Sequence, residues 1–240
     1  MHEEKTFQIR FNQILCDEMS KTFELTPLPL NPDFKIKYST RDEENVCIKS
    51  DYLGCIKTGG LRFGEMDFGG AMCVHYGSVP PAKDYDFPIL GYDFVNASKF
   101  LIGVIDLHPI FRDGEYFDKY IFPLKDLVKR YEWIPKAEGG RTEVHEWAKF
   151  YDSGYSFYRW CEGKYLNDLE EAFKDYVRVF YECIKKAEPL KDKKVLLARN
   201  QYMERYVDDY THKDPGSAPL KHHFGEEWGE RYFKDFLFAP

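Results

Sequence analysis

Hydrophobic and polar positions change their spacing along the 240 residues. Residues 7–25 mix apolar and polar positions at helical spacing, and three prolines within 26–34 interrupt that pattern. From 34 to 107 the period becomes two, in short segments separated by Gly, Pro and Asp. Such segments predict consecutive antiparallel β-strands, namely FKIKYST, NVCIKSD, GLRFGEMDF, AMCVHYGS, PILGYDFV and KFLIGVIDL.

Helical spacing returns after residue 107. Residues 115–133 are periodic but contain Pro123, and residues 193–210 and 226–238 also predict helices. The clearest amphipathic helix is 166–187, whose apolar stripe comprises Leu166, Leu169, Phe173, Tyr176, Val177, Phe180 and Ile184. Strands followed by helices predict an α+β chain, in which helices cover the faces of one antiparallel sheet. No linker or internal repeat interrupts 1–240, so we expect one domain.

Composition narrows the class of protein. The formal net charge of −7 gives no indication of nucleic-acid binding. The six cysteines form no Cys-x-x-Cys pair, which argues against zinc ribbons and iron–sulfur ligation and suits reduced thiols. No apolar run is long enough to span a bilayer, and the charged start lacks a signal-peptide core. We therefore expect a soluble, cytoplasmic protein without membrane contacts.

Aromatic residues make up 18% of the chain. They favour an aromatic core, or alternatively a pocket for a flat conjugated ligand. The common cofactor fingerprints are missing: no G-x-G-x-x-G follows a strand, and no Walker A or Gly-x-Ser-x-Gly motif occurs. The glycines of TGGLRFGEMDFGG lie in and between strands rather than before a helix. An enzyme of the nucleotide-binding or serine-hydrolase type is therefore not indicated.

His75 and Asp93 are the first candidate site residues. Alternation places His75 with Ala71, Cys73 and Gly77, and Asp93 with Ile89, Gly91 and Val95. The small residues in both sets leave room above a sheet for something broad and flat. If the two sets share a face, the imidazole and the carboxylate form a proton-donating pair. The alternative is a core histidine and an ordinary strand-end aspartate.

The turn before His75 predicts a register. Gly69-Gly70 has the composition of a two-residue hairpin turn. With that turn, Gly64 lies opposite His75, Arg62 lies diagonally from His75 on the same face, and Glu65 points to the other face. A slip of one residue would reverse this assignment.

The segment YTHKDPGSAPLKHHFGEEW, residues 210–228, contains three of the seven histidines. His212 is far from the His222/His223 pair, and adjacent histidines on a helix point about 100° apart. No recognised zinc or iron spacing results, so we expect no metal site. Asp214 precedes Pro215 and is either a helix cap or a carboxyl that overhangs a pocket. Arg141 is either a solvated side chain or a bidentate grip on a ligand carboxylate.

These residues resemble those of the ferredoxin-dependent bilin reductases, the family of phycocyanobilin and phycoerythrobilin synthases. The similarity is carried by FPILGYDFV with GVIDLHP, by RTEVHEWAKFYDSGYSFYRW and by THKDPGSAPLKHHFGEEWGERYFKDFLF. It implies an α/β/α sandwich around an antiparallel sheet. It also implies reduction of biliverdin IXα by single electrons from reduced ferredoxin, through bilin radicals and without a bound cofactor.

The resemblance also implies roles for individual residues. Asp93 matches the central catalytic Asp, and His75 matches, with a shift of one residue in the following loop, a strand His of the phycocyanobilin-forming branch. Asp214 matches a second proton donor at the A-ring side, and Arg141 matches an Arg that grips a propionate. Arg62 is a second candidate for propionate binding.

One departure bears on the product. The phycocyanobilin-forming branch has a Glu opposite its His for reduction of the D-ring vinyl group, whereas the predicted register puts Gly64 there. A viral group makes phycoerythrobilin although it resembles that branch, and it fits this mixture, which would place the protein in an infected cyanobacterial or other bacterial cell. We therefore expect phycoerythrobilin as product, through 15,16-dihydrobiliverdin, with a phycocyanobilin-forming enzyme as the alternative.

Partners and rival functions follow from the same residues. Ferredoxin is acidic, so the candidate contacts are lysines 185, 186, 191, 193 and 194, which could equally form a solvated face. We expect a monomer. A non-catalytic bilin carrier would use the same pocket, and a metal-dependent hydrolase would need the histidine cluster to hold zinc.

Overall fold

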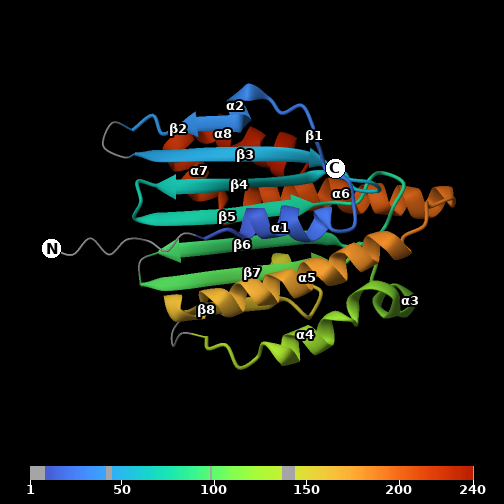
Figure 1. The fold of residues 1–240 in the computed structure, drawn as a ribbon. Coiled ribbons are helices and arrows are strands. Elements are labelled where there is room, and N and C mark those ends of the chain that lie inside the picture. Colours follow the sequence, from blue (N-terminus) through green and yellow to red (C-terminus); the bar gives the residue numbers. More distant parts are fainter. Residues whose placement is uncertain (1–8, 42–44, 98, 137–143, 240) are drawn as a thin grey trace.

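The computed structural model describes residues 9–41, 45–97, 99–136 and 144–239. Within these residues, eight strands form one antiparallel sheet in the order β1-β3-β4-β5-β6-β7-β8, and β2 also pairs with β3 (Figure 1). The strands are β1 (Thr26–Pro27), β2 (Ile36–Tyr38), β3 (Val46–Gly54), β4 (Leu61–Phe68), β5 (Met72–Val79), β6 (Ile89–Ala97), β7 (Phe100–His108) and β8 (Phe157–Cys161).

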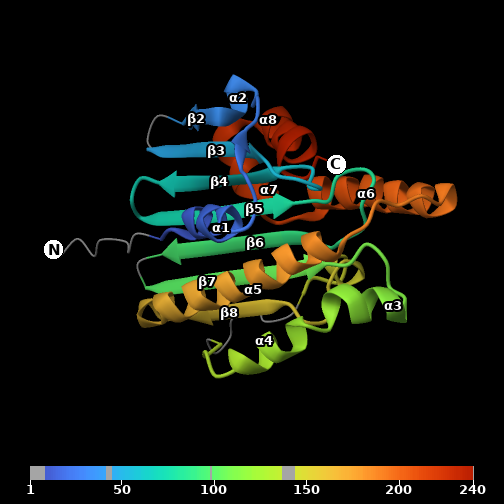
Figure 2. The ribbon, with the colours of Figure 1, turned by 45° about the vertical axis from the view of Figure 1, so that its right-hand side comes forward.

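Helices lie on both sides of this sheet. Those longer than a single turn are α1 (Phe11–Ser20), α4 (Leu124–Arg130), α5 (Leu166–Lys186), α6 (Lys193–Lys213), α7 (Ser217–Phe224), α8 (Glu226–Arg231) and the π-helical turns η1 (Phe117–Ile121) and η4 (Tyr232–Leu237). The short ones are α2 (Pro32–Lys35), α3 (Gly114–Tyr116), η2 (Ala148–Phe150) and η3 (Gly163–Tyr165). In both ribbon views α1 and α5 lie in front of the sheet and α6, α7 and α8 lie behind it (Figures 1 and 2). The predicted α+β class, with a central antiparallel sheet between helices, is confirmed.

The α1 and α5 side of the sheet is a closed hydrophobic core. The predicted stripe of α5 is buried at Leu169, Phe173 and Phe180. On α1, Phe11 stacks on Phe94 of β6, with ring centroids 3.4 Å apart and an interplanar angle of 2°. Phe173 meets both rings edge-on and completes the packing. Where α1 and α5 cover β6, this side of the sheet therefore excludes water.

The opposite side is less tightly covered. Along β6 and β7, the residues that point to this side are half-buried or exposed except Ile89 and Asp106, while their neighbours in sequence are buried. We call this side of β4 to β7, around Asp93, the open face; its half-buried residues include Gly91, Val95, Ile102 and Val104. Residues of the open face are paired across the strands, Asp93 with Val104 and Val95 with Ile102. The helices behind the sheet thus leave solvent access to the middle of it.

Two elements depart from the predicted pattern. The strand β8 was not expected, because its aromatic run SFYRW follows a loop and shows no clear alternation. The helix expected over 7–25 covers only Phe11–Ser20 within the described residues. Among the residues that are described, no helix combines the length and the apolar character needed to cross a membrane.

Candidate active site

The register of the β4–β5 hairpin corrects the sequence prediction by one residue. Glu65 lies opposite His75, and Gly64 lies opposite Tyr76. The turn has three residues rather than two, because Ala71 lies between Gly70 and the start of β5 at Met72; Gly69 and Gly70 adopt positive φ angles of +64° and +81°. The prediction that Gly64 faces His75 is therefore wrong, and so is the prediction that Arg62 shares a face with His75.

The pairing of β5 with β6 separates the two first candidates. Tyr76 lies opposite Asp93, and His75 lies opposite Phe94. Since paired residues point to the same side of a sheet and successive residues to opposite sides, His75 and Asp93 point away from each other. The predicted His75–Asp93 pair is wrong. Asp93 belongs to the open face, and His75 belongs to the closed side under α1.

His75 has the environment of a core histidine. It is 6% exposed, and its Nδ1 accepts a long hydrogen bond of 3.4 Å from the backbone N–H of Asn12 in α1. Its Nε2 lies 3.8 Å from Oε2 of Glu65. Burial lowers the pKa of His75, and the neighbouring Glu65 charge only partly opposes this effect. The structure thus supports the structural alternative for His75 rather than the catalytic one.

Asp93 has the environment of a proton donor. It lies in the middle of β6, and its side chain is exposed on the open face. Protein atoms nevertheless surround it on most sides, and this desolvation raises the pKa of Asp93 to about 7, with a further contribution from the charge of Asp214. A carboxyl group with this pKa carries a proton for much of the time at neutral pH and can give it to a bound molecule.

Asp214 reaches the same region from the opposite layer. Helix α6 ends at Lys213 because Asp214 precedes Pro215 and is extended, with φ −68° and ψ 123°. Its Oδ1 accepts a hydrogen bond of 2.7 Å from the N–H of Gly216, which holds the side chain at the turn. Burial raises the pKa of Asp214, while that bond and the nearby His145 and His108 lower it. The sequence-predicted residues Asp93 and Asp214 are thus brought together, one from the sheet and one from the helical layer.

A hydroxyl cluster beside Asp93 was missed by sequence reasoning. The Tyr232 hydroxyl lies 2.8 Å from that of Tyr76 and 2.6 Å from Oγ of Ser50. The Tyr76 ring leans across Gly64, where a Cβ atom would lie 2.6 Å from the Tyr76 oxygen. Gly64 therefore admits the ring that forms one wall next to Asp93. In the sequence Tyr76 was marked only by its position one residue after His75, which strand alternation places on the opposite face.

Of the two arginines predicted to bind a propionate, the structure describes only Arg62. Arg62 lies on the same side of the sheet as Asp93 but is only 5% exposed. Its guanidinium donates to the carbonyl of Ala239 and lies 5.0 Å from the centroid of the Tyr52 ring. These contacts occupy it, so a propionate would have to displace the carboxy-terminal segment to reach it. Arg141 lies outside the described residues.

The histidines of residues 210–228 do not form a cluster. His212 is exposed and its Nδ1 contacts Asp208 one turn earlier on α6, whereas His223 is buried against the ring of Phe68. In the part of the chain that the structure describes, no group of three or more His, Cys, Asp or Glu side chains is arranged to hold a metal ion.

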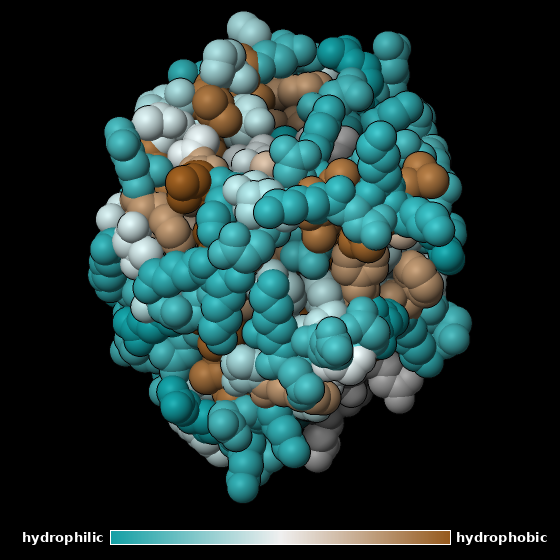
Figure 3. Space-filling model, turned by 90° about the vertical axis from the view of Figure 1, so that its right-hand side faces the viewer, coloured by the Kyte–Doolittle hydropathy of each residue, from teal (hydrophilic) through white to brown (hydrophobic). Residues whose placement is uncertain are grey.

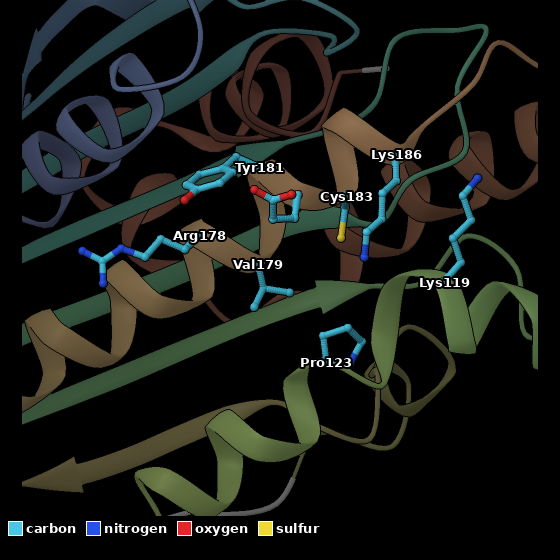
Figure 4. A pocket seen from close by; sticks show the side chains of 8 residues that line it. Lys119, Pro123, Arg178, Val179, Tyr181, Cys183 and Lys186 are labelled. Atoms are coloured by element: carbon cyan, nitrogen blue, oxygen red, sulfur yellow. The ribbon is translucent and has the colours of Figure 1, made fainter.

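Two hollows lie away from the open face. A groove of about 260 Å³ between α5 and η1 contains Lys119, Arg178 and Lys186 beside Cys183 (Figure 4). It lies on the α5 side of the sheet, so the sheet separates it from Asp93. A wider hollow of about 720 Å³ lies where residues 22–26 and 54–57 meet the end of α5. Neither contains Asp93 or Asp214.

The lysines suggested as ferredoxin contacts lie at the end of α5 and the start of α6. Figure 3 shows this end of the molecule, whose surface is mainly hydrophilic with scattered hydrophobic side chains. Lys185 is paired with Glu182 at 2.7 Å, so the charge there is mixed. Because an α-helix rises 1.5 Å per residue, Lys193 lies about 30 Å along α6 from Asp214. This distance separates the start of α6 from Asp214, and the lysine patch stays a prediction.

The raised pKa of Asp93 predicts a pH-dependent stability. A folded-state pKa above the ordinary 3.8 means that the folded protein binds more protons than the unfolded chain between about pH 4 and about pH 7, so the stability falls as pH rises through this range. Asp93→Asn should then raise the unfolding temperature by about 2–4 °C at about pH 8, after allowance for solvent screening of the exposed side chain. The increase should disappear near pH 4. The exposed control Asp51→Asn should show no increase at either pH. Calorimetry of the wild type and both variants measures the unfolding temperatures.

Comparison with known proteins gives the family. The sequence profile described as "Ferredoxin-dependent bilin reductase" matches residues 12–239. A protein of Nostoc punctiforme named 15,16-dihydrobiliverdin:ferredoxin oxidoreductase is 30% identical, over 95% of this chain and 93% of its own. A Gloeobacter violaceus protein named phycoerythrobilin:ferredoxin oxidoreductase is 27% identical, over 92% of this chain and 90% of its own.

A solved structure has the same fold. The tomato phytochromobilin synthase in complex with biliverdin superposes with a TM-score of 0.84 at 21% identity, covering 95% of this chain and 83% of that one. At this identity the likeness concerns the fold alone. The profile match over nearly the whole chain and the relatives at 30% identity go further. The chain belongs to the ferredoxin-dependent bilin reductase family.

Proposed function

We propose that this protein reduces biliverdin IXα to phycoerythrobilin through 15,16-dihydrobiliverdin, with electrons taken one at a time from reduced ferredoxin. The observation that carries the proposal is the pair of carboxyl groups at the open face, Asp93 on β6 and Asp214 after α6, each with a raised pKa. Val95, Ile102 and Val104, which lie around Asp93 on the same side of the sheet, are half-buried and form an apolar surface on which a flat tetrapyrrole could lie.

The proposed chemistry uses each carboxyl once. Each of the two reductions, at the 15,16 bond and at the A-ring side, consumes two electrons from two ferredoxins and two protons, one from the assigned carboxyl group and one from solvent. Asp93, which holds a proton near neutral pH, gives it to the bilin and makes it a better electron acceptor, so that the first electron forms a bilin radical. We assign to Asp93 the step at the 15,16 bond and to Asp214 the proton for the A-ring side. The ionised carboxyls are then reprotonated from solvent.

The product we expect depends on which residues lie next to Asp93. Resemblance to the phycocyanobilin-forming branch implies a Glu opposite a strand His in the bilin site. Here Glu65 and His75 do face each other, but on the closed side under α1. The corresponding positions of the open face hold Gly64 and Tyr76. Because Gly64 and Tyr76 occupy these two positions in place of a Glu–His pair, we do not expect reduction of the D-ring vinyl group.

A second candidate is an enzyme that stops at 15,16-dihydrobiliverdin. The relatives of Nostoc and of Gloeobacter that are 30% identical are named for that compound. A non-catalytic bilin carrier is a third reading, since a carrier could use the same open face.

An anaerobic assay with biliverdin IXα and reduced ferredoxin separates these functions. We expect 15,16-dihydrobiliverdin to form first and phycoerythrobilin to replace it, resolved by chromatography. Accumulation of 15,16-dihydrobiliverdin alone would support the second candidate, and phycocyanobilin would show that the reasoning from Gly64 and Tyr76 is mistaken. Binding of biliverdin without any reduction would identify a carrier.

A further inference from the structure

A histidine at the end of β7 lies within the open face, although neither the motifs nor the proposed mechanism assigns it a role. His108 ends the strand on the side that carries Asp93, and its side chain is 14% exposed. Its ring lies over Gly91, where an added Cβ atom would be 2.7 Å from Nε2. Because Gly91 and Asp93 are two residues apart on one strand, the ring stands beside Asp93. Glycine at position 91 is what admits the imidazole there.

The neighbours of His108 determine where its hydrogen lies. Nδ1 is 3.2 Å from the carbonyl oxygen of Tyr151 and 3.6 Å from Oδ2 of Asp106. A carbonyl can only accept, so Nδ1 carries a hydrogen and donates it to Tyr151. Nε2 is then the nitrogen directed at the Tyr210 hydroxyl, 3.3 Å away. A neutral ring accepts from Tyr210 through Nε2, and a protonated ring donates to it.

Acidic groups lie near this ring on its own strand and after α6, and Asp93 lies on the same side of the neighbouring strand. Asp106 lies on the same strand and is held by the N–H and hydroxyl of Ser153. Asp93 lies on β6, and Asp214 follows α6, whose Tyr210 contacts the ring. The charge of His108 also lowers the pKa of Asp214. A positive charge on the ring therefore stabilises the carboxylate form of Asp214.

We propose that His108 is a positioning residue for the second carboxyl: it holds Tyr210 in place and balances the charge of Asp214 once that group has given its proton away. This inference rests on the proposed function. When the O–H bond of Asp214 breaks and its proton passes to the bilin, Nε2 binds a proton from solvent and the imidazolium faces the new carboxylate. Transfer of that proton to Asp214 restores a neutral ring and a neutral carboxyl.

The test is His108→Asn, because Asn keeps an N–H for the Tyr151 carbonyl but cannot take up a charge. We expect biliverdin binding, followed by absorption, to change less than about twofold. At about pH 6 the kcat for phycoerythrobilin formation should fall about tenfold, less than the roughly 10²–10⁴-fold typical of a direct proton donor. The deficit should depend on pH, whereas a purely structural loss would be the same at every pH. The matched control is His212→Asn at the exposed end of α6, which should behave like wild type.

A second variant perturbs the position of the His108 ring while keeping the histidine itself. Gly91→Ala places a methyl group against Nε2 and should reproduce the pH-dependent deficit, with calorimetry to confirm folding. A uniform loss at all pH values, or no loss, in a folded His108→Asn protein would overturn the inference while the proposed function stands. Nitrogen NMR showing the hydrogen of a neutral His108 on Nε2 would also overturn it. Failure of the wild-type protein to reduce biliverdin would overturn the proposed function, and the inference with it.

Discussion

Replacing Asp93 by Asn should leave biliverdin binding within about threefold of wild type and lower the rate of its reduction by about 10³-fold. Asn has nearly the same shape but no acidic proton, whereas the Asp93 carboxyl retains one up to about pH 7. Loss of a general acid of this kind costs roughly 10²–10⁴-fold in rate. The electron from ferredoxin should still arrive, so the variant should accumulate a bilin radical. Paramagnetic resonance and absorption spectra under anaerobic conditions measure both effects.

The control for this variant is Asp51→Asn, which removes an exposed carboxyl from β3 on the other side of the sheet. It should turn over like wild type. Full turnover by Asp93→Asn would remove Asp93 from the mechanism and leave the open face without its central proton donor.

Replacing Asp214 by Asn should block the second reduction but not the first. The first reduction should proceed at close to the wild-type rate, and 15,16-dihydrobiliverdin should accumulate while phycoerythrobilin formation falls about 10²-fold. Asn can still accept the N–H of Gly216 and keep the turn after α6, so the fold should be retained. Chromatography of samples taken during the reaction gives both rates.

Asp208→Asn, on the exposed side of the same helix, is the matched control and should give the wild-type product. An Asp214→Asn enzyme that forms phycoerythrobilin normally, or one that fails already at the first reduction, would contradict the separate roles given to Asp93 and Asp214.

The spacing of hydrophobic positions along the chain predicted the architecture well. Alternation over 34–107 gave the antiparallel strands, and the stripe of α5 gave the helix that covers one side, because burial of one face imposes these periods directly. The Asp-Pro pair also located Asp214 at a helix end, since proline restricts the residue before it. The strand β8 was missed because its aromatic residues carry no regular alternation.

Which strand faces meet could not be predicted in the same way. Alternation correctly grouped the neighbours of His75 and those of Asp93, but it cannot relate one strand to the next. That relation depends on the turn at Gly69-Gly70 and on the loop between β5 and β6, and a shift of one residue reverses every side chain. Tyr76 therefore occupies the place beside Asp93 that was expected for His75.

Contacts between residues that are far apart in the sequence could not be predicted from it either. Tyr232 meets Tyr76 and Ser50 only because η4 packs back on the sheet. His108 meets Tyr210 because the last turns of α6 pack against the end of β7. Such pairs are set by tertiary packing, and no local pattern marks them.

The location of the substrate is the point on which the roles of Asp93, Asp214 and His108 all depend. A crystal structure of the protein with biliverdin IXα bound measures it most directly. We expect the tetrapyrrole on the open face, with its nitrogens or lactam oxygens within hydrogen-bonding distance of Asp93 and its A-ring end toward Asp214. A bilin bound on the α1 side beside His75, or in the groove between α5 and η1, would contradict the proposed site.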